Sequence, residues 1–330
     1  MKLHRDINAF RVLIEDIHSK TEYRTDVLEK DYYVVLMLSE LAAKQNDGLP
    51  AYFKGGTALY KALKSTNRFS EDIDLSVDTR GCTNAQNNKR LENATKKYAA
   101  LPRDREQGKT NRSEVIAVYT YEPVTSYDTN DSLQRFGRLK IEATSFTISE
   151  PVTSLEVTPM LYDLATDEQK QILETNYDVK PFEVQTITIE RIFIDKLFAA
   201  EAYVRKSEEP HRAFEAAKHI YDLTVLRADP QIKALLSDTA QMARLLQIRM
   251  AEEQERRDGI PGVIPQEFRF FADAADNSKV KAAYETMQRQ YVLRDSDRIE
   301  YETAMKALTD IQTELMKNAA WLECQLPKKI

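Results

Sequence analysis

The chain has 330 residues, of which 42% are hydrophobic and 30% are charged, and its formal net charge is −6. These values are typical of a soluble globular protein of about two domains, and the acidic balance argues against a surface that binds polyanions everywhere. Two distant cysteines, Cys82 and Cys324, argue against a disulfide framework, and four histidines without an HExxH motif argue against a zinc centre.

Membrane and export signals are not expected. Charges occur throughout the first residues, and no run of about 18 uncharged apolar residues follows. The sequence therefore predicts a cytoplasmic protein without a signal peptide or a membrane segment.

Two amphipathic helices and a short strand are expected at the start of the chain. Apolar residues at helical spacing indicate helices over 6–20 and 26–45, and Asp26 is the expected N-cap of the second. The apolar run 51–53 follows a Gly-Leu-Pro break and predicts a strand.

A glycine turn follows that strand. Gly55 and Gly56 are expected to turn the chain, and Thr57 to cap a short helix over 58–64. In the segment 69–77, acidic residues alternate with apolar ones, which is the period-2 pattern of a strand with one buried face.

The remaining elements are predicted from the same periodicities. They are a helix over 83–101, an exposed basic loop or helix end over 102–113, strands over 114–122, 138–148 and 182–187, and helices over 188–206, 210–226, 230–255, 266–274, 278–291 and 295–324. The expected fold is therefore α/β (α+β): a mixed-sheet core with N-terminal helices over 1–185, and a helical region over 186–330.

Asp72 and Asp74 are the first candidates for chemistry. Because the two residues are two positions apart on a strand, their carboxylates project from one face, and their Cα atoms are expected to lie about 6.5–7 Å apart. Side chains at this spacing can converge on divalent cations, and hard oxygen ligands suit Mg²⁺, with Mn²⁺ as an alternative. Glu142, on a second alternating strand, is the candidate third carboxylate. A solvent-facing strand is the commoner meaning of an isolated Asp-x-Asp pattern.

Gly55, Gly56 and Thr57 fit a second task, phosphate binding. Glycines let the backbone approach phosphate oxygens closely, and a new helix presents free N–H groups to an anion. Only 15 residues separate Gly56 from Asp72, so the triphosphate and the metals can share one cleft. Taken alone, Gly-Gly-Thr is a common turn.

A local basic segment lies between the predicted elements of the core. Residues 87–112 hold eight basic and three acidic side chains, and Arg205, Arg212 and Lys218 add cations farther along the chain. Such residues suit an RNA backbone, although a solvated basic surface is the more common explanation.

The order of these motifs resembles the AbiEii/MenT group of nucleotidyltransferase-like toxins in the DNA polymerase β-like superfamily. The core of the resemblance is Lys54-Gly55-Gly56-Thr57-Ala58-Leu59 followed by Arg68-Phe69-Ser70-Glu71-Asp72-Ile73-Asp74-Leu75. Further parts are Glu29-Lys30-Asp31-Tyr32, Leu139-Lys140-Ile141-Glu142, Asp195-Lys196-Leu197-Phe198-Ala199 and His219-Ile220-Tyr221-Asp222-Leu223. Two positions depart from the group's pattern: Asp195 replaces a Glu, and His219 replaces an Asp.

The resemblance implies roles for single residues. Asp72 and Asp74 would bind Mg²⁺, assisted by Glu142, and Gly55, Gly56, Thr57, Arg68 and Ser70 would hold a nucleoside triphosphate (NTP). Lys196 would meet the phosphates, and Asp222 would complete the active-site cleft. Two alternatives remain at this point: Lys196 as a helix-surface lysine, and Asp222 as a helix cap or a partner of Lys218.

The resemblance also implies a function. It predicts a Mg²⁺-dependent nucleotidyltransferase that transfers a nucleotide from an NTP to RNA, most simply tRNA, as the toxin of a toxin–antitoxin or phage-defence pair. A cognate antitoxin encoded nearby is then the expected protein partner. Two other functions stay open: nucleotidyl or kinase-like transfer to a protein hydroxyl, and a non-catalytic regulatory module.

Overall fold

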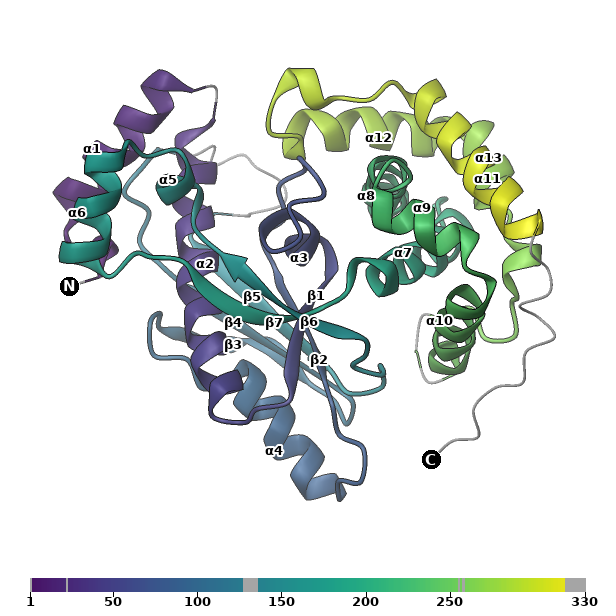
Figure 1. Cartoon of the computed structure of the whole chain (residues 1–330), viewed down its shortest axis with the longest axis horizontal. Coiled ribbons are helices and arrows are strands. Elements are labelled where there is room, and N and C mark those ends of the chain that lie inside the picture. The colour runs from purple at the N-terminus through teal and green to yellow at the C-terminus, as the bar shows by residue number, and fades with distance from the viewer. Residues whose placement is uncertain (1, 22, 127–135, 255, 257–258, 318–330) are drawn as a thin grey trace. The chain divides into compact units, whose positions relative to one another are not determined.

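The computed structural model describes residues 2–21, 23–126, 136–254, 256 and 259–317 (Figure 1). The chain forms two compact units. Unit 1 consists of residues 1–63, 69–145 and 152–186, and unit 2 of residues 64–68, 146–151 and 187–330. The end of the helix predicted over 295–324 and Cys324 lie outside the described residues.

A seven-stranded mixed sheet forms the centre of unit 1, in the order β3-β4-β5-β2-β1-β7-β6 (Figure 1). The strands are β1 (Ala51–Lys54), β2 (Ile73–Val77), β3 (Arg103–Thr110), β4 (Glu114–Thr120), β5 (Arg138–Thr144), β6 (Val152–Val157) and β7 (Phe182–Ile187). The α/β fold class predicted from the sequence is confirmed.

The register of the central strands brings the acidic residues together. β2 runs parallel to β5, so that Asp74 pairs with Glu142, and antiparallel to β1, so that Asp74 also lies opposite Lys54. Ile73, Leu75 and Ile141 are fully buried and hold these strands in the core. The alternation of buried and polar residues therefore orients the acidic side chains away from the core.

The N-terminal helices α1 (Ile7–Lys20) and α2 (Thr25–Asn46) match the predicted positions. α2 is buried along most of its length, because it packs against α1 and α5 (Met160–Asp163). The prediction that Asp26 caps α2 is wrong. Arg24 is the N-cap residue, and Asp26 lies in the first turn, where its carboxylate accepts hydrogen bonds from the Arg24 guanidinium.

The short helix after β1 begins earlier than predicted. α3 spans Gly55–Lys61, with Lys54 as its N-cap residue, so Thr57 lies inside the helix and does not cap it. β2 likewise begins at Ile73, and Asp72 immediately precedes the strand.

One segment predicted as a loop is a strand. Residues 102–113 contain β3, an exposed strand at the edge of the sheet, paired antiparallel with β4. Its run of charged side chains does not resemble a half-buried strand, and charges are a common protection of exposed sheet edges. The helix α4 (Asn84–Thr95) begins at a Thr83 capping box and packs on β2, β4 and β5.

Three elements between 150 and 180 were not predicted: β6, α5 and α6 (Asp167–Tyr177). The side chains of β6 alternate between exposed and intermediate burial, so the strand lacks a strong apolar pattern. It is the other edge of the sheet, next to β7.

Unit 2 is built of helices. They are α7 (Ile189–Val204), α8 (Pro210–Leu226), α9 (Pro230–Ser237), α10 (Thr239–Glu253), α11 (Phe270–Ala275), α12 (Ser278–Tyr291) and α13 (Tyr301–Lys317), with 3₁₀ turns at Pro265–Glu267 and Asp295–Asp297. α8 is the central helix and packs against α7, α12 and α13.

The single helix predicted over 230–255 is two helices. Asp238 separates them with non-helical backbone angles, and its carboxylate accepts from the N–H groups of Ala240 and Gln241 to cap α10. Within the described part of the chain, no helix is both long and apolar enough to cross a membrane.

Candidate functional site

The glycine turn lies directly against Asp74. Gly55 has φ +81°, a conformation that favours glycine, and a Cβ at this position would come within 2.4 Å of Asp74 Oδ2. The turn and the acidic strand therefore share one location in unit 1, as the sequence predicted. The contact also explains why glycine is needed at position 55, both for its backbone conformation and for its lack of a side chain.

Thr57 ties the helix to the start of β2. Its buried hydroxyl donates to the backbone carbonyl of Asp72 and is 2.9 Å from Ser70 Oγ. Thr57 therefore fixes the backbone that carries Asp72. Its contact with an NTP stays a prediction, and Gly56, like Thr57, is buried.

Two of the three predicted carboxylates, those of Asp72 and Glu142, flank an ammonium group. Lys140 Nζ lies 2.8 Å from Asp72 Oδ2 and 3.9 Å from Glu142 Oε2. Among the described residues, no three His, Cys, Asp or Glu side chains are grouped closely enough to hold a metal ion. In this arrangement a lysine balances the acidic charge.

Asp74 is the most perturbed acid of this cluster. Burial, followed by the charges of Glu142 and Asp72, raises the pKa of Asp74 to about 7, although Lys140 and Lys54 act in the opposite direction. Burial alone would lower the pKa of Lys140. The negative charge of Asp72, with smaller contributions from Asp74 and Glu142, raises the pKa of Lys140 above its ordinary value. Crowded carboxylates of this kind favour a cation among them.

The pairing of Lys140 with Asp72 was not predicted, although the sequence contains a signal for it. The patterns Asp72-Ile73-Asp74 and Lys140-Ile141-Glu142 alternate in the same phase, and in parallel register Ile73 pairs with Ile141. Asp72 then lies beside Lys140 as Asp74 lies beside Glu142. Aligning the two strands by their buried isoleucines would have identified the pair.

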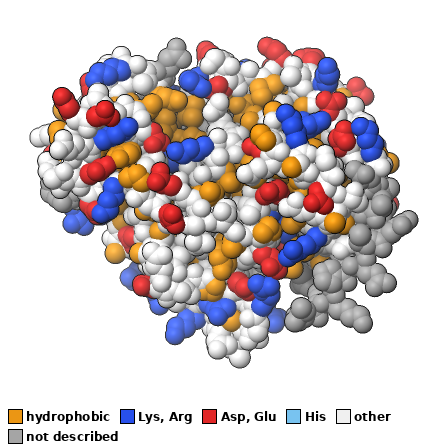
Figure 2. All heavy atoms as spheres, in the orientation of Figure 1, with side chains coloured by type: hydrophobic (Ala, Val, Ile, Leu, Met, Phe, Trp, Pro, Cys, Tyr) orange, Lys and Arg blue, Asp and Glu red, His pale blue; other side chains and the backbone are white. Residues whose placement is uncertain are grey.

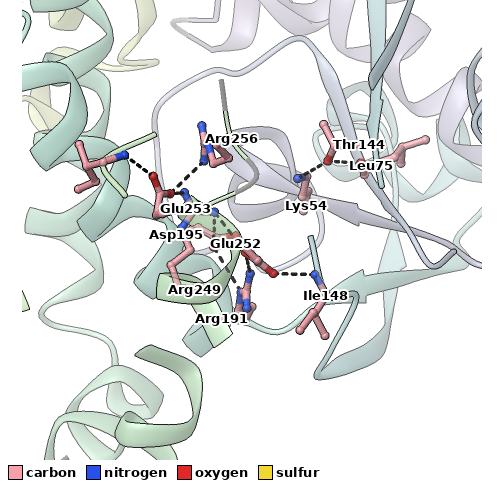
Figure 3. Close-up of polar contacts among 11 residues, drawn as sticks. Lys54, Leu75, Thr144, Ile148, Arg191, Asp195, Arg249, Glu252, Glu253 and Arg256 are labelled. Atoms are coloured by element: carbon pink, nitrogen blue, oxygen red, sulfur yellow. Dashed lines mark hydrogen bonds and ion pairs between the residues drawn. The ribbon is translucent and has the colours of Figure 1, made fainter. Parts of the chain in front are cut away.

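Lys54 approaches the same strands from β1. Its ammonium lies 3.0 Å from Thr144 Oγ1 on β5. Figure 3 marks this contact with a dashed line. Two lysines on neighbouring strands, Lys54 and Lys140, thus accompany the acidic residues. This gives the site a mixed charge.

A second polar centre lies within unit 2 and contains three predicted residues. The carboxylate of Asp222 on α8 accepts from Arg68 Nε at 3.0 Å and Arg68 Nη2 at 2.9 Å, and it lies 2.8 Å from Lys196 Nζ on α7. All three side chains are almost completely buried. Lys196 is therefore not a helix-surface lysine.

The charges of this centre are strongly coupled. Burial alone would raise the pKa of Asp222, but Arg68 and Lys196 outweigh it and hold that pKa well below its usual range. The alternative partner Lys218 pairs with Glu215 instead, at 2.8 Å. His219, at the position of the missing Asp, is half-buried and stacks on Tyr203, and desolvation of its ring together with the charge of Lys196 keeps its pKa far below the ordinary value.

A further buried ion cluster of unit 2 was missed by sequence reasoning. Glu252 on α10 receives Arg191 at 2.5 Å and Arg249 at 3.3 Å, and it accepts from the backbone N–H of Ile148 at 2.6 Å (Figure 3). Asp195, a member of the resemblance motif, lies 3.3 Å from Arg191. Asp195 thus belongs to a structural network that joins α7 to α10.

The motif of α2 is also internal. Glu29 accepts from the N–H groups of Val124 and Thr125, and Asp31 lies 2.8 Å from Lys61 Nζ on α3. Lys30 donates to the backbone carbonyl of Arg138, at the start of β5. These charged residues therefore attach α2 to the elements that carry the candidate site.

Comparisons with known proteins agree with the residue motifs. Residues 37–309 match the family described as nucleotidyl transferase AbiEii toxin, type IV TA system. The chain is similar to MenT4, a nucleotidyltransferase toxin of Mycobacterium tuberculosis H37Rv, with 14% identity over 94% of this chain and 98% of that one and a TM-score of 0.41. It is also similar to JHP933 of Helicobacter pylori, with 17% identity over 87% of this chain and 92% of that one and a TM-score of 0.39. No curated protein sequence matches the chain. Because the family match spans most of its length, the chain belongs to the AbiEii family of nucleotidyl transferase toxins.

Proposed function

We propose that this AbiEii-family protein transfers a nucleotide from an NTP to the 3′ end of an RNA, most simply a tRNA, in a reaction that requires Mg²⁺. The observation that supports this most strongly is the approach of Gly55 to the Asp74 carboxylate, beside Asp72 and Glu142. A phosphate-binding turn next to clustered carboxylates is the arrangement that nucleotidyl transfer needs.

The ligand chemistry of the acidic residues suits a divalent cation, although their carboxylates would have to draw closer together to hold it. Asp72, Asp74 and Glu142 offer only hard oxygen ligands, and the pKa of Asp74 is raised first by burial and then by the charges of Glu142 and Asp72. When bound there, Mg²⁺ would supply neutralisation of the triphosphate and activation of the acceptor hydroxyl. The Lys140 ammonium lies against Asp72 Oδ2, so it competes with a metal for that oxygen.

The other side chains position these acids. Thr57 holds the backbone at Asp72, Gly55 leaves room at Asp74, and Ile73 anchors the strand between them. The roles of Arg68, Ser70 and Lys196 in binding the triphosphate are proposals from the family resemblance, with Asp222 holding the Arg68 and Lys196 head groups.

The physiological role follows the family. A toxin of a type IV system acts together with an antitoxin, and we propose a cognate antitoxin protein and growth inhibition in the cytoplasm. Transfer to a protein hydroxyl is the alternative, because the same acids would serve it.

The test uses purified protein, each α-labelled NTP in turn and total RNA, with Mg²⁺ or with EDTA. We expect one NTP to label a band of tRNA size with Mg²⁺ only. Asp74→Asn should abolish labelling, whereas Asp78→Asn should retain it, because Asp78 follows β2 at the strand's other end and pairs with Arg80. Label on protein would select the alternative acceptor, and full activity of Asp74→Asn would refute the metal site.

A further inference from the structure

A basic cavity lies in unit 1 between the end of α2 and one face of α4. We call it the α4 groove; its volume is about 560 Å³. Its cations are Lys44 from α2, Lys89 and Arg90 from α4, and Lys97 just beyond α4. Figure 2 shows Lys and Arg side chains at the lower end of the molecule, where Figure 1 places α4.

The groove carries an uncompensated positive charge. Four of its lining residues are cationic and one, Asp47, is acidic. Lys89 and Lys97 are exposed, and no described carboxylate lies within 4 Å of either ammonium. Their neighbour Lys96 differs, because it pairs with Glu92 at 2.9 Å.

The spacing along α4 gathers these residues on one face. Lys89 and Arg90 lie three and four residues after Gln86, Asn93 lies four and three residues after them, and all line the groove. Leu91 and Ala94, on another face of α4, are fully buried. From Gln86 to Lys97 this face extends about 16 Å, which exceeds one phosphate group and suits a polyanion.

Lys44 supports the same conclusion. Its ammonium donates to the backbone carbonyl of Asn93 at 2.9 Å and to that of Lys97, both of which are neutral acceptors. Burial and the neighbouring charge of Lys97 lower the pKa of Lys44 to about 8, and Glu40 opposes this only in part. The Glu40 carboxylate itself accepts from the N–H groups of Ala99 and Ala100. A bound anion would stabilise the charged form of Lys44.

The groove is separate from the candidate active site. β1 leaves the groove at Pro50, and Gly55 is five residues farther along the chain, so the two places lie about 16 Å apart along the strand. Arg90 donates to the carbonyl of Asp78 at 2.7 Å, just past the far end of β2. The groove therefore lies at the end of these strands opposite to Asp74.

We propose that the α4 groove binds the sugar–phosphate backbone of the acceptor RNA, at a distance from the position where its end reacts. This inference rests on the proposed RNA acceptor. Cationic side chains interleaved with amides, with Lys89 and Lys97 free of carboxylate partners among the described residues, match phosphate and ribose groups. An acidic protein segment is the less suitable ligand, because no Trp, Tyr, Phe or Met lines the groove, and such residues dominate protein-binding sites.

The experiment measures binding of a fluorescein-labelled tRNA pool to the full chain by fluorescence anisotropy, without NTP, from 0.05 to about 1 M salt. The test variant is Lys89→Gln/Lys97→Gln. The matched control is Lys20→Gln/Lys180→Gln, which removes the same charge from two exposed lysines of unit 1 that already pair with Asp16 and Asp178.

Loss of two phosphate contacts should reduce the slope of log K against log salt by about 1.4, and should raise Kd roughly 25-fold at 0.1 M salt. The difference should disappear near 1 M salt, and the control should stay within about twofold of the unmodified chain. Equal binding by the test variant and the control would overturn the inference. The inference would also be overturned if the Lys89→Gln/Lys97→Gln variant lost more of its binding to poly-glutamate than of its binding to tRNA.

Failure of the proposed function gives a different result. If no NTP labels RNA while tRNA binding still depends on Lys89 and Lys97, transfer to RNA is refuted and the groove is supported. If RNA is labelled by the unmodified chain but the test variant binds tRNA normally, only the groove is refuted.

Discussion

The ion pair network around Asp222 gives the sharpest prediction about stability. The Asp222 carboxylate is inaccessible to solvent and receives two bonds from Arg68 and one from Lys196, at 2.8–3.0 Å. Asp222→Asn keeps the shape of the side chain and removes its charge. Two buried cations then lose their counter-ion, which costs about 3–5 kcal/mol.

This magnitude can be compared with that of an exposed pair on the same helix. Glu215 is seven residues before Asp222 and pairs with Lys218 at 2.8 Å, with a side-chain exposure of 36%. Because solvent screens such a pair, Glu215→Gln should cost less than about 1 kcal/mol. The two variants differ mainly in burial.

The pH dependence follows from the lowered pKa of Asp222. A carboxyl group with a pKa below its unfolded value of about 3.9 stabilises the fold fully above that pH. This contribution is lost as the pH falls through the folded-state pKa. The difference between the unmodified chain and Asp222→Asn should therefore be constant from about pH 5 to 8 and should shrink below about pH 3.9.

The assay is native-state hydrogen exchange read by mass spectrometry on peptides of α7 and α8. It reports local opening free energies and does not require a chain of two units to unfold in one step. A loss of 3 kcal/mol corresponds to exchange that is faster by about a hundredfold. A loss under about 1 kcal/mol, or a loss equal to that of Glu215→Gln, would refute the coupling described here.

Two predictions concern the candidate active site. Gly55→Ala should reduce transfer at least tenfold, because its Cβ would overlap Asp74 Oδ2, whereas Gly81→Ala introduces the same backbone strain at φ +73° with no atom within 4 Å and should leave transfer unchanged. Both variants should lose about 1–3 kcal/mol of unfolding free energy in urea denaturation. Equal transfer activity of the two variants would contradict the steric argument. Thr57→Val removes the hydrogen bond to the Asp72 carbonyl and should lower kcat with little change in the KM for NTP. A change in KM alone would instead indicate that Thr57 contacts the nucleotide.

The local motifs of this chain could be predicted from the sequence because they depend on residues that are close together in the chain. The alternation around Ile73 and Leu75 predicted a strand with its acids on one face, and the Gly55-Gly56 pair predicted a turn that the positive φ of Gly55 confirms. Even the basic face of α4 follows from intervals of three and four residues. Steric fit and side-chain period depend on neighbours in the chain, so the sequence specifies them directly.

Long-range electrostatics had to come from the tertiary structure. The strand 138–144 pairs with 73–77 across more than sixty residues, and only this register places Lys140 against Asp72. Arg68 and Asp222 lie 154 residues apart and meet only after unit 2 has folded. Edge strands such as β3 and β6 were missed for the same reason, because their pairing partners and not their own side chains make them strands. Burying a charged group costs free energy unless an opposite charge compensates it. The packing of the folded chain decides which residue supplies that opposite charge.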